Sequence, residues 1–167
     1  SGLGLNGLNA TDQVNAFQGF SVFPFEANRF DGTRIVIGAN GLYESTDSGD
    51  NLTTLNAGGL ANPSAMAYGG MLGGAANQDV LYAGVGGRLF LRTTAGGALN
   101  QLNNYPGNAP VDIAMDPDNW QRVYVTDGTN VFRSIDAGVN WTRVNNPSAS
   151  GGALLTVEVF GGSASPN

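Results

Sequence analysis

The chain has 167 residues, 41% of them hydrophobic, which is enough for one substantial domain with its own core. Seven basic residues, all Arg, and 13 acidic residues give a net charge of −6, which argues against a nucleic-acid backbone or an anionic membrane as partner. Neither Cys nor His is present, which excludes disulfides, thiol chemistry and the commonest general base and metal ligand. No apolar run reaches about 18 residues, and we predict no membrane insertion.

Short strands separated by turn residues account for most of the chain from residue 20 onward. Before them, Thr11–Phe17 is expected to form a turn or two of helix at most. The strands fall into three groups of four, with a glycine-rich loop inside the second group and one further strand at Leu154–Phe160. The predicted strands are Phe20–Phe25, Arg34–Gly38, Leu42–Ser45 and Leu52–Asn56 in the first group, Ser64–Tyr68, Val80–Gly84, Arg88–Arg92 and Leu99–Asn103 in the second, and Val111–Met115, Arg122–Thr126, Asn130–Ser134 and Trp141–Asn145 in the third.

The three groups are copies of one sequence repeat. Residues Arg122–Asn146 align without a gap on Val80–Asn104, and Ser134–Gly138 aligns on Ser45–Gly49. Four strands in a repeat of roughly 45 residues is typical of a β-propeller blade. A β-sandwich or a β-solenoid is an alternative, but neither predicts a four-strand repeat so directly.

A turn with a regular pattern of polar residues recurs in each repeat, most completely at Ser134, Asp136, Gly138 and Trp141 in the third. The Ser and Asp side chains can hydrogen-bond the backbone of a tight turn, the Gly permits a positive φ, and the aromatic ring can pack beneath the turn. The equivalent residues are Ser45, Asp47, Gly49 and Leu52 in the first repeat and Arg92, Thr94, Gly96 and Leu99 in the second, which retains only the Gly.

The spacing Ser-x-Asp-x-Gly-x-x-Trp resembles the Asp-box of BNR-type repeats. Proteins with similar motifs include sialidases, xyloglucan-type glycosidases, sortilin-like receptors, photosynthetic assembly factors and large secreted bacterial surface proteins, and Val111–Trp120 is most similar to the blade opening of the last group. The resemblance covers about residues 20–160 and implies an all-β fold, a β-propeller segment of about three four-stranded antiparallel blades within a larger ring. The implied divisions are 1–19, the end of a preceding blade and a linker; 20–57, 58–106 and 107–147, three blades; and 148–167, the first strand of a further blade.

The acidic residues of the repeated turn, Asp47 and Asp136, are interpreted as structural, because a catalytic residue is needed once and not in every blade. Asp112 and Glu158 are candidate ligand-binding acids, since both are expected on innermost strands near a central channel, but acids bonded to neighbouring backbone amides are the better interpretation. A sialidase-like site would also need a cluster of three Arg and an Arg-Ile-Pro segment; that segment is absent. Arg34 and Arg122 occupy equivalent strand starts, so their repetition favours a structural role.

Aromatic side chains near loops are candidates for stacking on sugar rings, namely Tyr105 and Trp120, with Tyr43 as a further example. For Trp120, packing at the edge of the core is at least as good an interpretation. Two oxygen-rich loops, Asp47–Asn51 and Asp116–Asn119, could hold Ca²⁺, but neither has the full spacing of an EF-hand and Asx turns are the better interpretation. No cofactor, resident metal or catalytic residue is predicted.

These observations predict a non-catalytic scaffold or binding module, secreted or exposed at a cell surface, that contacts a glycan or a protein through loops connecting the blades. The remaining blades would come from the parent chain or from another copy. Two alternatives are a fragment of a sialidase- or xyloglucanase-like glycosidase and a structural surface protein that assembles by pairing open strand edges.

Overall fold

The computed structural model describes residues 24–55, 60, 62–144 and 152–161. These residues contain three separate four-stranded antiparallel sheets and no helix, which confirms the predicted all-β class. No helix among them could therefore span a membrane. The predicted helical turn at Thr11–Phe17 lies outside the described residues.

Each sheet is a meander in which the strands lie in chain order. Every neighbouring pair is antiparallel and is joined by the segment that connects the two strands in the chain, so no strand crosses over another. The strands are β1 (Phe25–Ala27), β2 (Ile35–Gly38), β3 (Leu42–Ser45) and β4 (Thr53–Leu55) in the first sheet; β5 (Pro63–Leu72), β6 (Ala75–Val85), β7 (Arg88–Arg92) and β8 (Asn100–Gln101) in the second; and β9 (Asp112–Met115), β10 (Val123–Thr126), β11 (Val131–Ser134) and β12 (Thr142–Arg143) in the third.

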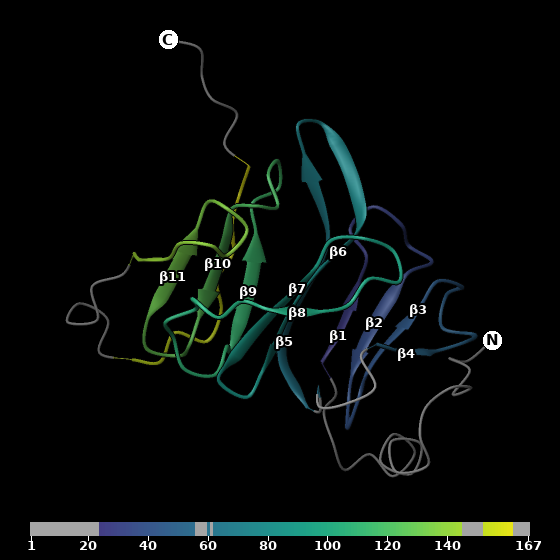
Figure 1. Ribbon diagram of the computed structural model, residues 1–167, viewed down its shortest axis with the longest axis horizontal. Coiled ribbons are helices and arrows are strands. Elements are labelled where there is room, and N and C mark those ends of the chain that lie inside the picture. Colours follow the sequence, from purple (N-terminus) through teal and green to yellow (C-terminus); the bar gives the residue numbers. More distant parts are fainter. Residues whose placement is uncertain (1–23, 56–59, 61, 145–151, 162–167) are drawn as a thin grey trace.

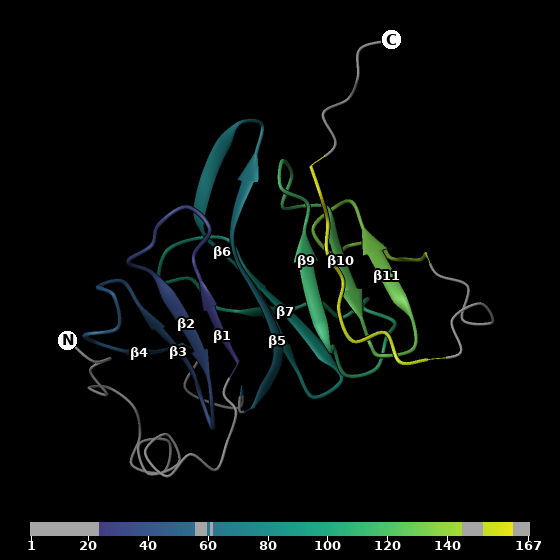
Figure 2. The same cartoon turned by 180° about the vertical axis from the view of Figure 1, so that it is seen from behind.

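The three sheets stand side by side with their first strands together (Figures 1 and 2). Strand β5 contacts both β1 and β2, and β9 contacts both β5 and β6, so each sheet packs its face on the one before it. This is the arrangement of successive propeller blades around a common axis.

The two larger layers of the core lie one on each side of the second sheet, and a smaller cluster of Ala39, Tyr43 and Leu52 lies at the first sheet. Successive residues of a strand point to opposite faces, so Leu81 and Phe90 enter the layer shared with the first sheet, while Tyr82 and Leu91 enter the layer shared with the third. Because both faces are covered, Val80–Val85 reads as a continuous apolar run without polar alternation.

The glycine-rich stretch of the second repeat is not the loop that the sequence analysis predicts. Strands β5 and β6 run past the predicted ends and form one long hairpin that closes at Gly73 and Gly74. Both of these glycines have positive φ, 60° and 81°, as tight hairpin turns require. The prediction was wrong because glycine has a poor propensity for strands. Here the turn geometry and the pairing of β5 with β6 outweigh that propensity.

Two other predicted strands differ from the structure. The first sheet begins at Phe25, later than the predicted Phe20–Phe25, most of which lies outside the described residues. Leu154–Phe160 is extended beside the third sheet, but its single bridge, from Leu154 to Gly128, makes no ladder with another described strand.

At both contacts between successive sheets, a glycine of one sheet lies against a proline at the start of the next. A Cβ at Gly38 would lie 2.2 Å from Cγ of Pro63, and a Cβ at Gly84 would lie 2.6 Å from Cβ of Pro110. Both prolines introduce the first strand of the following sheet, so the missing Cβ is what allows successive sheets to approach this closely.

Replacing Gly84 with alanine should therefore weaken the contact between the second and third sheets. We expect Gly84→Ala to lower the free energy of unfolding by about 1–3 kcal/mol, the usual cost of overpacking. Gly87→Ala is the matched control, because a Cβ there meets nothing within 4 Å. Urea unfolding of both variants measures the difference, and equal stabilities would contradict this account of the contact.

Candidate functional site

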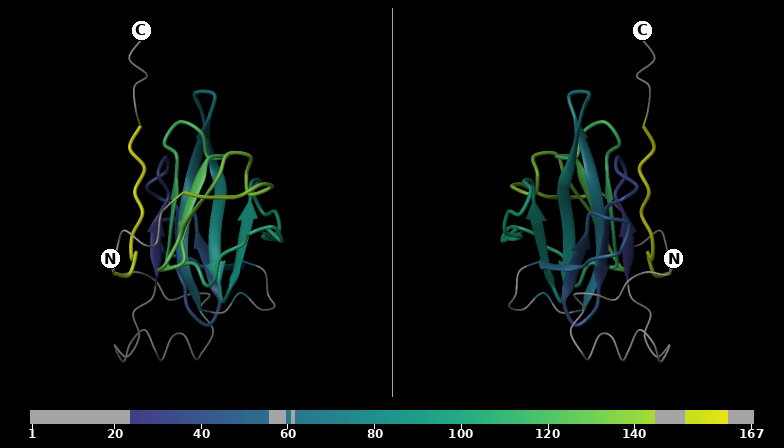
Figure 3. Two further views of the ribbon diagram at one scale, coloured as in Figure 1. Left: turned by 90° about the vertical axis from the view of Figure 1, so that its left-hand side faces the viewer. Right: turned by 90° about the vertical axis from the view of Figure 1, so that its right-hand side faces the viewer.

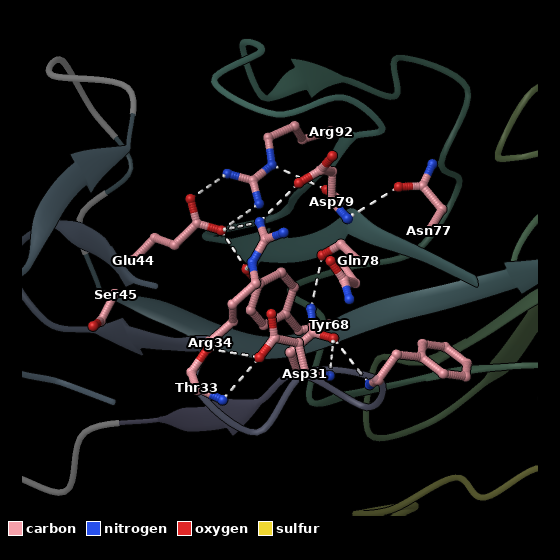
Figure 4. A network of polar contacts seen from close by, with 12 residues as sticks. Asp31, Thr33, Arg34, Glu44, Ser45, Tyr68, Asn77, Gln78, Asp79 and Arg92 are labelled. Carbon is pink, nitrogen blue, oxygen red and sulfur yellow. Dashed lines mark hydrogen bonds and ion pairs between the residues drawn. The ribbon is translucent and has the colours of Figure 1, made fainter. Parts of the chain in front are cut away.

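The densest cluster of charged side chains lies between the first and second sheets and is centred on Glu44 (Figure 4). Arg92 holds the Glu44 carboxylate with two parallel hydrogen bonds, Nη2 to Oε1 at 2.6 Å and Nη1 to Oε2 at 2.9 Å. Arg34 donates from Nη2 to Oε1 at 3.1 Å, and the Tyr68 hydroxyl donates to the same oxygen. Glu44 thus receives donors from both sheets, and its two oxygens are fully engaged.

A second carboxylate completes the cluster. Asp79 accepts from Nη2 of Arg34 at 2.8 Å, while its backbone carbonyl accepts from Nε of Arg92 at 3.0 Å. Arg34 also donates from Nε to the Tyr68 hydroxyl at 2.8 Å, and both guanidinium groups lie over the Tyr68 ring, 5.5 Å and 5.9 Å from its centroid. Two positive and two negative charges therefore balance one another around one aromatic ring.

The cluster is well shielded from water, since the Arg92 side chain is 0% exposed and that of Glu44 is 11% exposed. Burial alone would raise the pKa of Glu44, but the hydrogen bonds from Arg92, Tyr68 and Arg34 outweigh it and lower the pKa to about 2. Burial, together with the hydrogen bond to Glu44, raises the pKa of Tyr68 to about 12. Glu44 therefore stays ionised and Tyr68 stays protonated at neutral pH, and neither group titrates there.

This cluster explains why the repeated turn is degenerate in the second repeat. Arg92 stands where the other repeats have Ser45 and Ser134, and it points into the sheet interface instead of capping the turn. The sequence analysis aligned Arg92 correctly but did not find its partner. The sequence did contain a signal for this contact. Glu44 is charged at a position where the next repeat has the apolar Leu91, and a buried charge is rarely left without a partner of opposite charge.

The first copy of the repeated turn is closed by its own side chains. The Ser45 hydroxyl donates to Asp47 Oδ1 at 2.7 Å and accepts from the Gly49 N–H at 2.9 Å. Asn51 donates twice to Asp47, from its backbone to Oδ1 at 2.9 Å and from its side chain to Oδ2 at 2.7 Å. The hydrogen bonds from Asn51 and Ser45 lower the pKa of Asp47 to about 2, while Leu52 is buried beneath the turn.

The third copy repeats the same bonds. The Ser134 hydroxyl lies 2.8 Å from both Asp136 Oδ1 and the Gly138 nitrogen, and Asn140 reaches Asp136 at 2.9 Å and 2.7 Å. The Trp141 indole donates to the Gly138 carbonyl at 3.0 Å. In both copies, both carboxylate oxygens of the aspartate accept hydrogen bonds within the turn. These bonds favour a structural role for the aspartate.

In the second copy, a hydrogen bond between backbone groups closes the turn. The Thr94 carbonyl accepts from the Gly97 N–H at 3.0 Å, and Gly96 has a φ of 62°. Leu99 is buried in the layer between the first and second sheets. Arg92, which stands at the position of the serine, points into the sheet interface and does not cap this turn.

The two predicted ligand-binding acids, Asp112 and Glu158, have different surroundings. Asp112 accepts from its neighbour Ile113 at 2.9 Å and from the Val157 N–H at 2.8 Å, so both of its oxygens have protein donors. Glu158 is exposed, and no recorded bond joins it to Asp112 within the described residues. The sequence analysis did not single out Glu26, an exposed residue of β1. Nearby protein removes part of its solvent and raises its pKa, and the charge of Asp112 adds to the rise.

The aromatic candidates are corrected by the structure, because they belong to the core. Trp120 is only 9% exposed, and Tyr43 only 2%. Tyr105 packs edge-on against Phe132 and Trp141, at 5.8 Å and 5.3 Å between ring centroids, and its hydroxyl is buried without a recorded partner. The burial of Trp120 and Tyr43 leaves neither ring open for stacking on a sugar, while Tyr105 is half-buried.

The oxygen-rich loops are occupied by internal hydrogen bonds. Asp116 accepts backbone N–H bonds from Asp118 and Asn119 at 2.9 Å and 3.1 Å, and Arg122 binds its other oxygen at 2.8 Å. The described residues contain no cluster of three or more acidic side chains placed to hold a metal ion.

The loops between first and second strands form a connected rim, and this surface is open to solvent. In the first sheet, Asn28 in the loop before β2 donates to the carbonyl of Gln78 on β6 at 2.7 Å. Arg29 reaches from the same loop to the carbonyl of Pro117 in the third sheet at 3.1 Å. The Arg29 guanidinium also lies 5.2 Å from the centroid of the half-buried Phe30 ring.

The long β5–β6 hairpin forms the centre of this rim. The Trp120 N–H donates to the carbonyl of Met71 at 2.8 Å, and Leu72 bridges to Asn119, so the loop before β10 is attached to the hairpin. Loop 28–34, the hairpin end 69–78 and loop 116–122 are defined here as the loop rim. Figure 3 shows the hairpin projecting beyond the neighbouring sheets, and Leu72 near its tip is 39% exposed.

Comparison with known proteins supports the fold. No protein-family profile and no curated protein sequence matches this chain. Similar solved structures include YCF48 from Cyanidioschyzon merolae, with a TM-score of 0.65 and 18% identity over 96% of this chain and 54% of that one. An ancestral GH74 enzyme has a TM-score of 0.60 and 19% identity over 75% of this chain and 18% of that one. The GH74 xyloglucanase from Xanthomonas campestris has a TM-score of 0.54 and 21% identity over 72% and 21%.

At these identities the likeness concerns fold alone. With its three four-stranded antiparallel sheets, this chain is a partial β-propeller. It spans about half the length of YCF48 and about a fifth of the length of the GH74 enzymes.

Removing one partner of the Glu44–Arg92 pair should cost more than removing both. Arg92→Ser leaves Glu44 shielded from water without its main partner, and we expect a loss of about 3–5 kcal/mol in unfolding free energy. The double variant Glu44→Leu/Arg92→Ser reproduces the residues of the next interface, Leu91 and Ser134, and should recover about 1–3 kcal/mol of that loss. Denaturant unfolding of the single and double variants gives the coupling, and simple additivity would show that the pair does not interact.

Lowering the pH should remove the contribution that the ionised Glu44 side chain makes to the free energy of unfolding. Its pKa is lowered from 4.5 to about 2 in the folded protein, so its stabilising effect is complete above pH 4.5 and is lost as the pH falls toward 2. Glu44→Gln cannot titrate, so the stability gap between wild type and this variant should narrow between pH 5 and pH 2. A gap that stays constant would mean that the Glu44 carboxylate is not stabilised in its charged form.

Proposed function

We propose that this chain is a non-catalytic binding and scaffold module that contacts a protein partner through the loop rim. The observation that carries the proposal is the bonding of the rim loops of all three sheets to one another, through Arg29 to Pro117 and Met71 to Trp120. Loops held in this way present a surface that needs little ordering when it binds.

The side chains of the rim favour a protein over a glycan. Its exposed groups include Arg29, which lies over the half-buried Phe30 ring, and the aliphatic Leu72. Arginine and apolar side chains are common at the centres of protein interfaces, while a sugar site favours open aromatic faces. Trp120, the rim residue best suited to stacking on sugar, is turned into the core.

The absence of catalysis is supported by how the acids are used. Asp47 and Asp136 close turns, Glu44 is held between two sheets, and Asp112 accepts two backbone N–H bonds. A secreted or cell-surface location remains part of the proposal, on the grounds that the chain lacks Cys and Lys and is rich in Asn and Gly. Among similar folds, one structure is described as YCF48 bound to a D1 peptide.

One observation favours a second candidate, a fragment of a glycosidase propeller. Glu26 is exposed with a raised pKa, and Asp112 is close enough to contribute to that rise. Glycoside hydrolysis uses two acids with separated pKa values across a sugar. This candidate requires Asp112 to release at least one of its backbone donors.

Selection of peptides from a displayed random library against the 167-residue chain tests the proposed function. We expect selected peptides to lose about tenfold or more in affinity for the variant Arg29→Glu/Leu72→Asp, since central interface residues carry most of the binding energy. Arg88→Glu is the control, because Arg88 is an exposed arginine at the start of β7, outside the rim. The proposal fails if the selected peptides bind the rim variant unchanged, or if the chain hydrolyses xyloglucan and Glu26→Gln abolishes that activity.

A further inference from the structure

Strand β6 extends past the end of its neighbour β7 in the second sheet. Strand β7 pairs only with the stretch Leu81–Val85 of β6, although β6 begins at Ala75. After β7 the chain turns away, and the Thr94 carbonyl accepts from the Gly97 N–H at 3.0 Å in that turn. The part of β6 that belongs to the projecting hairpin therefore lies beyond the end of β7 (Figures 1 and 3).

The backbone of Ala76 points away from the hairpin. Ala76 lies opposite Met71 of β5, and the Met71 carbonyl accepts from the Trp120 N–H at 2.8 Å on the side away from β6. In an antiparallel pair, two opposed residues either bond each other or both point their groups outward. The N–H and the carbonyl of Ala76 therefore point to the side of β6 that faces away from β5, where no hydrogen bond to another described residue is recorded for them.

Nearer to the body of the sheet, the same side of β6 is closed by polar side chains. The Asn77 side chain donates to the Thr93 carbonyl at 3.0 Å, just after the end of β7. Arg92 donates from Nε to the Asp79 carbonyl at 3.0 Å. The opening is thus confined to the tip of the hairpin, and the side of residues Ala75–Asn77 that faces away from β5 is defined here as the hairpin edge.

The hairpin edge lacks the features that usually keep strand edges from pairing, namely charged side chains and prolines. The stretch Tyr68–Gln78 contains neither. Ala75 and Ala76 are exposed and have small side chains, so another backbone can approach them closely. Leu72 lies opposite Ala75 on the same face of the hairpin and is 39% exposed, which provides apolar surface beside the edge.

The opposite edge of the hairpin already binds an extended segment. Leu72 bridges to Asn119 in an antiparallel arrangement, and the next residue, Trp120, donates its N–H to Met71. The hairpin, β7 and the turn after β7 all lie within residues 62–144, which are described without a gap. The hairpin edge is therefore left open by the place where β7 ends, and the pairing on the other side shows how such an edge is filled.

We propose that the hairpin edge binds an extended segment of a partner protein as an added β-strand. The residue of that segment opposite Ala76 donates to its carbonyl and accepts from its N–H, and the residue opposite Ala75 has an apolar side chain on the face of Leu72. The hairpin edge is part of the loop rim, so this inference rests on the proposed function and specifies that the protein partner binds there as an extended strand.

A second copy of this chain fits the hairpin edge less well than a different protein. If two copies of β6 paired antiparallel at Ala76, the bodies of the two molecules would extend in opposite directions from the paired tips. The contact would then be limited to the two tips, far below the roughly 1,200 Å² that a stable interface buries. Each copy also has a net charge of −6, which opposes association. An extended segment of another protein can instead continue from the edge onto the loops beside it.

The probes are the random peptides selected against the 167-residue chain, synthesised with a fluorescent label. Ala76→Pro removes the outward N–H but no hydrogen bond of the hairpin itself, and proline is tolerated at such edge positions. We expect this variant to bind the peptides about tenfold or more weakly than the wild type, because the ring also blocks the approach of a strand. Ala76→Val is the matched control: it retains the N–H and should bind within about twofold of the wild type.

Hydrogen exchange tests the pairing in the unaltered protein. The Ala76 amide is unbonded in the free chain, so its exchange, followed by NMR, should slow by about tenfold or more when a selected peptide is bound. The Ala75 amide serves as the internal reference, because Ala75 pairs with Leu72 at the end of the hairpin and its exchange should change little. The same spectra show whether Ala76→Pro keeps the fold.

Four results would overturn the proposal: no peptide is selected, the selected peptides bind Ala76→Pro as tightly as the wild type, the exchange of the Ala76 amide is unchanged in the complex, or light scattering shows a dimer that Ala76→Pro dissociates. If affinity is lost in Arg29→Glu/Leu72→Asp but retained in Ala76→Pro, the proposed function stands and this inference fails. If affinity is lost only in Ala76→Pro, strand pairing stands and the role proposed for the rim side chains fails.

Discussion

The packing of one β-sheet face on the next is the interaction on which the rest of this structure depends. The second sheet is stable as a blade because side chains leave it alternately toward both neighbours, so that Leu81 and Tyr82 are each fully buried on opposite sides. No single sheet of four short strands could bury both faces alone. The closeness of that packing is set by the Gly–Pro contacts at Gly38 and Gly84, where a Cβ would force the sheets apart.

The residue at one repeated position differs from sheet to sheet, so each sheet has its own polar character there. The first interface has the Glu44–Arg92 pair, the second has Leu91 at the position of Glu44, and the third sheet has Arg133 at that position. A buried ion pair adds little net stability, because its desolvation offsets its attraction, but a mismatched partner leaves an unpaired charge. Different residues at one repeated position therefore favour a single order of sheets, and similar blades are prevented from packing in the wrong sequence.

The sequence predicted what repeats and failed where one repeat differs from the others. Strand β11 begins and ends close to prediction because hydrophobic alternation and the Ser134–Asp136 turn mark it in the sequence. The β5–β6 hairpin was missed because Gly73 and Gly74 read as a loop, although strand pairing extends up to them. The Glu44–Arg92 contact joins different sheets, and Trp120 faces inward because its backbone is bonded to Met71. Such contacts depend on how sheets dock, which local sequence patterns do not contain.

The distribution of polar groups also shows how the described part of the chain uses its acidic side chains. A catalytic carboxylate needs a free oxygen and a tuned pKa, but the pKa of Glu44 and that of Asp47 are held near 2 by the bonds that stabilise the fold. Within the described residues, the group left open to solvent is of a different kind: the apolar tip of the hairpin at Leu72. Apolar side chains of this kind are common at the centres of protein interfaces, so the function proposed above assigns binding to the loop rim, while these acids serve the turns and the interfaces of the fold itself.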